Sequence, residues 1–104
     1  MIAKFAQGKK AQDVVILDMR KISNITDFFI ICSGNSTRQV RATADYIIEQ
    51  LKQLGKRPWH IEGYRYALWL LLDYGDVVVH IFHAPTRQFY DLERLWGDAP
   101  LIKI

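Results

Sequence analysis

Acidic and aromatic residues around one short connection have the types and spacing that chemistry or recognition needs. Asp73 and Asp76 flank Tyr74 and Gly75, and Trp69 precedes them in an apolar run. Paired carboxylates can hold the metal ions that nucleotidyl transferases use, but those enzymes place the acids on one strand face beside a Gly-Ser loop. Here the acids flank a tight turn, and no third carboxylate is placed by sequence to join them. The pattern therefore favours an exposed acidic hairpin tip over a metal site.

A second candidate for chemistry is the Ser-Gly-Asn-Ser segment at residues 33–36, which lies between an apolar run and a helix start. Helix N-termini can bind phosphate through their backbone amides. The segment has one glycine and no Lys-Ser or Lys-Thr pair, so it lacks the fingerprint of a nucleotide-binding loop. A turn with a helix cap is the favoured interpretation.

Histidine and cysteine form no metal-binding or nucleophile pattern. His80 and His83 are three residues apart across a strand end, where their side chains do not converge, and no cysteine pair supports them or His60. We expect His80 to be a hydrogen-bonded residue of the sheet. Cys32 lies in an apolar run, where a thiol behaves as a small hydrophobe, and is expected to be buried and inert. The sequence gives no positive support for catalysis, a cofactor or a bound metal.

Apolar runs predict the strands that position these residues: 14–19, 27–33, 66–72 and 77–82. Their continuous apolar character is typical of strands covered on both faces. The short connection at 73–76 predicts an antiparallel hairpin. The earlier strand–helix–strand order favours parallel pairing, so the sheet should be mixed.

The clearest predicted helix covers residues 36–54. Ser36 and Gln39 match a capping box, apolar residues then recur at helical spacing, and Gly55 is suited to end the helix. A short helix ending near Gly8 and a helix over 86–96 are also expected, followed by an apolar tail at 100–104 that docks or frays. The chain reads as one α/β domain over residues 1–104, a mixed β-sheet flanked by helices.

Composition narrows the class of protein. The net charge of +3 leaves RNA binding open, but the basic residues are dispersed and no aromatic–basic stacking platform is evident. No signal-peptide pattern begins the chain and no apolar stretch is long enough to span a membrane, so a cytoplasmic protein is expected.

Strand alternation indicates that the acidic connection could serve in partner recognition instead of chemistry. Trp69, Leu71 and Asp73 should share one face of their strand, and Tyr74 at the turn should meet solvent. Aromatic residues flanked by acids are typical interface anchors for a basic partner. The alternative is that Trp69 is simply a core residue.

Five ordered blocks of this sequence resemble the RsfS/Iojap family of ribosomal silencing factors, and the resemblance runs from about residue 5 to residue 98. The blocks are DVVILD at 13–18, SNITDFFIICSG at 23–34, EG at 62–63, WLLLDYGDVVVH at 69–80 and FYDLERLW at 89–96. Their number and order make the resemblance specific.

The resemblance implies a fold similar to nucleotidyltransferases but without their catalytic residues. It implies an interaction protein, not an enzyme, that binds the large ribosomal subunit through its protein numbered fourteen, near the intersubunit face. Bound there, the protein blocks joining of the small subunit and represses translation. Matched residue by residue, the contacts are Trp69, Asp73, Tyr74 and Asp76. A homodimer is a further implication, and no cofactor or small-molecule substrate is implied.

Two other functions stay open at this point. One is a nucleotidyltransferase-like enzyme that uses Ser33 and Gly34 for phosphate and the two acids of the connection for metal. The other is a basic RNA-binding domain, for which Arg38 and Arg41 are the candidate contacts.

Overall fold

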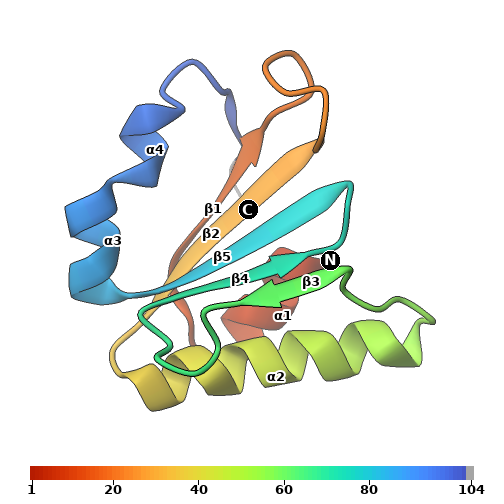
Figure 1. Cartoon of the computed structure of the whole chain (residues 1–104), viewed down its shortest axis with the longest axis vertical. Coiled ribbons are helices and arrows are strands. Elements are labelled where there is room, and N and C mark those ends of the chain that lie inside the picture. The colour runs from red at the N-terminus through yellow and green to blue at the C-terminus, as the bar shows by residue number, and fades with distance from the viewer. Residues whose placement is uncertain (103–104) are drawn as a thin grey trace.

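The computed structural model describes residues 1–102 of the chain as one α/β domain (Figure 1). Its elements, in chain order, are α1 (Ile2–Gly8), β1 (Gln12–Asp18), β2 (Phe28–Gly34), α2 (Thr37–Gln53), β3 (His60–Glu62), β4 (Trp69–Asp73), β5 (Val77–His83), α3 (Ala84–Tyr90), α4 (Leu92–Leu95) and β6 (Leu101–Ile102). No helix among these residues has the length and apolar character that crossing a membrane requires.

One six-stranded sheet in the order β3-β4-β5-β2-β1-β6 forms the centre of the domain. β2 and β5 pair in parallel, and all the other neighbours pair antiparallel. The mixed sheet and the antiparallel β4–β5 hairpin are therefore confirmed. The parallel pair joins two strands far apart in sequence, because α2 and the β3–β4 segment lie between them.

Helix α2 begins and ends as its sequence predicts. The Ser36 hydroxyl accepts a hydrogen bond from the Gln39 backbone N–H at 3.1 Å, and the Gln39 side chain accepts one from the Asn35 N–H at 2.7 Å. At the other end Gly55 takes φ +80°. Its N–H and that of Lys56 bond back to carbonyls of the last turn, which is the Schellman arrangement.

Two apolar layers hold the sheet between the helices. The larger layer packs the sheet against α1 and α2 and includes Leu70, Leu72 and Ile81, all fully buried. The smaller layer lies on the opposite face, where Phe82 and Ile31 pack beneath Leu92 of α4. In Figure 1, α3 and α4 stand at one side of the sheet, away from β3 and from the β4–β5 turn.

The expected helix over residues 86–96 is wrong as a single element. Asp91 takes the left-handed conformation, φ 47°, and divides it into α3 and α4. Aspartate tolerates this conformation better than most residues. The break lets Leu92 reach the sheet, where it is 7% exposed, and brings the Trp96 ring to 6.0 Å from Phe29.

One edge of the sheet also differs from the prediction, and the other takes one of the two expected forms. β3 is not among the strands that the apolar runs predict, and it pairs with β4. The apolar tail docks, because Leu101 and Ile102 pair with β1. The last two residues of that tail lie outside the described part.

Candidate partner-binding surface

One face of β4 is left partly uncovered by helices. Trp69, Leu71 and Asp73 alternate with buried Leu70 and Leu72 and are half-buried, as strand alternation predicts. The register places Glu62 of β3 beside Leu71 and places Val78 of β5 beside Asp73. We call the surface formed by Glu62, Trp69, Leu71, Asp73 and Val78 the open face.

Trp69 is fixed at the boundary between the open face and the smaller core. Its ring stacks on Phe82 at 5.0 Å between centroids and meets Tyr90 of α3 at 4.8 Å. Its indole N–H donates to Nδ1 of His80 at 3.1 Å. Trp69 is therefore both a packing residue and a half-exposed one, so the core and interface interpretations are compatible.

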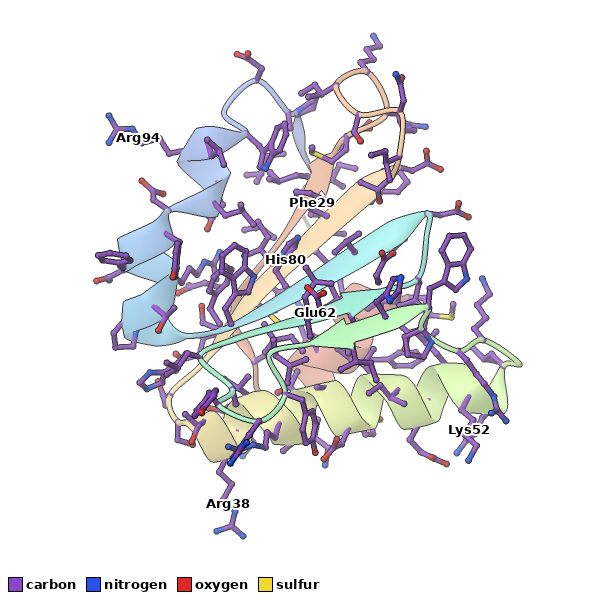
Figure 2. All side chains as sticks on the ribbon, in the orientation of Figure 1. Phe29, Arg38, Lys52, Glu62, His80 and Arg94 are labelled. Atoms are coloured by element: carbon purple, nitrogen blue, oxygen red, sulfur yellow. The ribbon has the colours of Figure 1, made fainter. Side chains whose placement is uncertain are left out.

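His80 lies beneath the open face and is only 4% exposed. Figure 2 shows it beside Phe29 at the middle of the sheet, and the two ring centroids are 4.6 Å apart. Burial lowers the pKa of His80 from 6.5 to about 4, because the charged ring would lose its hydration. The expected hydrogen-bonded sheet histidine is confirmed. Its Nε2 is buried and has no hydrogen-bond partner within residues 1–102.

Only one of the two acidic residues at the β4–β5 connection is exposed. Asp76 is exposed, whereas Asp73 is half-buried and its carboxylate accepts a hydrogen bond from the Gly75 N–H at 2.8 Å. The Asp76 carbonyl accepts bonds from the Asp27 and Phe28 amides and from the Thr26 hydroxyl, which ties the turn to the start of β2. The turn is thus a rigid, acidic corner of the domain.

Tyr74 is half-buried, and not exposed at the turn as expected. Its ring packs against the larger core, on the α1–α2 side of the sheet, and its hydroxyl is buried with no partner in the described residues. Burial raises the pKa of this hydroxyl. The structure thus places Trp69 and Asp73 on the same face of β4, at its two ends, and places the Tyr74 side chain on the opposite side.

Exposed apolar residues extend the surface beyond the predicted set. Phe89 and Leu95 are 81% and 72% exposed, and Tyr90 beside Trp69 is 52% exposed. Phe89 and Leu95 recur at helical spacing with Leu92 and Trp96, which predicts a buried face, so sequence reasoning missed their exposure. The left-handed Asp91 turns them outward, and no pattern in the sequence marks that break.

The loop before α2 is occupied by its own contacts. The Asn35 amide and Ser36 hydroxyl serve the helix cap, and Ser33 accepts a hydrogen bond from Arg87. Within residues 1–102, no three His, Cys, Asp or Glu side chains lie close enough to hold a metal ion. Cys32 is fully buried, and burial raises its pKa to about 12, which fits the expected inert thiol.

Comparison with known proteins gives a consistent result. The family model described as "Ribosomal silencing factor during starvation" matches residues 1–104. A ribosomal silencing factor RsfS of Halalkalibacterium halodurans is 50% identical over 96 residues, which cover 92% of this chain and 82% of that protein. The RsfS of Bacillus subtilis is 50% identical over 99 residues, covering 95% and 84%. The chloroplastic protein Iojap of Zea mays is 36% identical, and the match covers 99% of this chain and 45% of that protein.

Solved structures share the fold. A crystal structure of a Chromobacterium violaceum protein has a TM-score of 0.90 at 35% identity and covers 93% of this chain and 81% of its own. One of a Bacillus halodurans protein has a TM-score of 0.87 at 43% identity, covering 99% and 94%. Because the family model matches residues 1–104 and the fold is shared, the chain belongs to the RsfS family of ribosomal silencing factors.

Proposed function

We propose that this chain binds the large ribosomal subunit through its protein fourteen, near the intersubunit face, and so blocks association with the small subunit and represses translation. The observation that carries the proposal is the open face, where half-exposed Trp69 shares a strand face with Asp73 and meets the exposed Tyr90. The mechanism is occlusion, so no bond is made or broken and the chain is not an enzyme.

The choice of the large subunit has support from the relatives. One of them, from Mus musculus, is named "Mitochondrial assembly of ribosomal large subunit protein 1" and is 34% identical over 99 residues, covering 92% of this chain. The family description names ribosomal silencing during starvation. A protein that acts on the large subunit by filling a surface needs a rigid, partly apolar face rather than a catalytic cleft.

The chemistry of the open face suits a basic protein surface. Asp73 and Glu62 lie on it, and exposed Asp76 follows Asp73 across the short β4–β5 turn. Acids at the rim steer a basic partner, while an aromatic anchor supplies buried area at the centre. In this proposal Tyr74 does not touch the partner. Its ring packs against the larger core and supports the turn that carries Asp73 and Asp76.

The first test is co-sedimentation of the chain with isolated subunits, with subunit joining scored in the same gradients. We expect the chain to sediment with the large subunit alone and to reduce the joined peak. Trp69→Ala should weaken binding about thirtyfold, the effect of losing an anchor residue worth about 2 kcal/mol. Circular dichroism must show that this variant stays folded, since Trp69 also packs on Phe82.

A charge test separates recognition from folding. Asp73→Asn retains an oxygen that can accept from the Gly75 N–H, so the double variant Asp73→Asn/Asp76→Asn keeps the turn but loses its charge. We expect roughly tenfold weaker binding to isolated protein fourteen, with less salt dependence. The matched control, Glu49→Gln/Asp98→Asn, removes two exposed acids elsewhere and should bind normally. Equal loss in both doubles would place the contact outside the open face.

A further inference from the structure

A large cavity opens on the other side of the sheet, beyond the end of α2. Its volume is about 680 Å³, within the range of small-ligand sites. Apolar side chains from α1, α2 and the strands form most of its wall, and Lys56, Arg57 and Trp59 come to it from the segment after α2. The apolar contributors include Ile2, Ile16, Phe28, Ile30, Leu51 and Val77.

Trp59 at this cavity is exposed but held in place. It is 74% exposed, yet its backbone N–H donates to the Asp73 carbonyl at 2.7 Å. Its ring lies so close to Gly75 that a Cβ on that glycine would stand 3.0 Å from the indole. An exposed aromatic ring that is fixed by a hydrogen bond and a glycine contact loses little entropy when something stacks on it.

Three basic residues precede this ring in the chain, and two of them line the same cavity. Lys56 and Arg57 are exposed, and the Schellman turn at Gly55 fixes the backbone just before them. Lys52 is exposed in the last turn of α2 and lies at the same end of the helix (Figure 2). None of the three forms a salt bridge with another group of residues 1–102. Their charges are available to a partner.

We propose that single-stranded RNA binds here, with an unpaired base stacked on Trp59 and its flanking phosphates on Lys56, Arg57 and Lys52. An aromatic face next to unpaired cations is how proteins bind unpaired nucleotides without reading sequence. An acidic peptide would use the cations but would have no planar group to stack on the indole. The sequence does not predict that Trp59 is a stacking platform, because neither its exposure nor its contact with Gly75 follows from a local pattern. The inference deepens the proposed function, since a ribosome-bound protein lies beside ribosomal RNA.

Fluorescence anisotropy with a labelled single-stranded RNA of about ten nucleotides tests the proposal. We expect Trp59→Ala to weaken binding by roughly fivefold to a hundredfold. Lys56→Gln/Arg57→Gln should make the fall of log affinity with log salt shallower, reducing the magnitude of the slope by about 1.4. Asp76 also lines the cavity, so Asp76→Asn should strengthen RNA binding because it removes a like charge from the phosphate path.

Matched controls decide between this site and general attraction by a basic protein. Tyr66→Ala removes another aromatic residue, 71% exposed, from a different loop. Arg38→Gln/Arg94→Gln removes two charges from exposed sites at a distance from Lys52 in Figure 2. Both controls should bind RNA as the unaltered chain does. The proposal is overturned if the two charge doubles weaken binding equally, if Trp59→Ala is neutral, or if a mononucleotide or polyglutamate competes as well as RNA.

The two proposals fail separately. Loss of RNA binding with intact binding to isolated protein fourteen would refute the RNA site and leave the open face standing. RNA binding that depends on Trp59, in a chain that does not bind protein fourteen, would refute the open face and leave the RNA site standing. Asp76→Asn is expected to affect the two partners oppositely: it should weaken binding to protein fourteen and strengthen binding to RNA.

Discussion

Trp69 and His80 are joined across neighbouring strands by a 3.1 Å hydrogen bond from the indole Nε1 to the imidazole Nδ1. Because Nδ1 accepts, the neutral ring carries its proton on Nε2, which is buried and has no partner in the described part of the chain. The orientation of the proposed anchor thus depends on a neutral histidine. In the proposed function, binding and folding are therefore coupled at this one contact.

Acid should destabilise the fold through His80. Its pKa is about 4 in the folded state and near 6.5 when unfolded, so between these values the unfolded chain binds a proton that the folded chain does not. The free energy of unfolding should be independent of this group above pH 6.5 and should fall by roughly 3 kcal/mol as the pH drops to 4. Urea denaturation at a series of pH values measures it.

The control for that experiment is His80→Asn, whose side-chain oxygen can take the place of Nδ1 but does not titrate. This variant is expected to be less stable at pH 7, because it leaves space beside Phe29. Its unfolding free energy should nevertheless change less between pH 6.5 and pH 4. If both proteins lose stability equally, other groups cause the acid sensitivity.

Removing the Tyr74 hydroxyl should stabilise the domain. Among residues 1–102 this buried hydroxyl has no partner, so Tyr74→Phe removes a desolvated polar group and keeps the ring in the larger core. We expect unfolding to cost about 1 kcal/mol more, and large-subunit binding to be unchanged. Thermal and urea denaturation provide the measurement. A loss of stability would mean that the hydroxyl has a hydrogen-bonded water.

Much of the frame of this fold follows from local sequence. The capping pair Ser36 and Gln39 and the C-terminal Gly55 define α2 almost to the residue. The short turn at Gly75 fixes the β4–β5 hairpin, and alternation along β4 correctly assigns Trp69 and Asp73 to one face. In each case the signal comes from residues a few positions apart, where backbone geometry alone decides the outcome.

The features that shape the surface depend on distant contacts instead. β3 is three exposed residues whose strand character comes only from pairing with β4. The direction of the Tyr74 ring, the break at Asp91 and the exposure of Phe89 follow from how the helices meet the sheet. The sequence therefore predicts where an acidic corner lies but not which aromatic residues the surface exposes.

Arg87 should be a main support of the α3–α4 segment. Its guanidinium donates to the Asp13 carbonyl at 2.7 Å, to the Ser33 hydroxyl at 2.9 Å and to Glu93 at 2.8 Å. Its side chain is only 11% exposed. Arg87→Met keeps the aliphatic stem but leaves three acceptors unpaired, and we expect it to cost about 2–4 kcal/mol of unfolding free energy.

The matched variant for Arg87 is Glu93→Gln, which retains an acceptor and removes only the charge of a partner that is 34% exposed. It should cost under about 1 kcal/mol. Hydrogen exchange should show faster exchange in α4 for Arg87→Met alone. Similar costs for the two variants would mean that the ion pair, and not the contacts to Asp13 and Ser33, holds the segment.

Two glycines with positive φ should respond very differently to alanine. At Gly55, φ +80°, an added Cβ meets nothing within 4 Å, so Gly55→Ala should cost only the conformational penalty of about 1 kcal/mol. At Gly63, φ +75°, the Cβ would stand 2.0 Å from the Trp69 carbonyl oxygen. Gly63→Ala must therefore displace the start of β4 and should cost at least twice as much. Because that displacement moves Trp69, it should also weaken large-subunit binding. Urea denaturation and co-sedimentation of both variants check this, and equal costs with normal binding for Gly63→Ala would show that the β3–β4 connection can shift without moving the anchor.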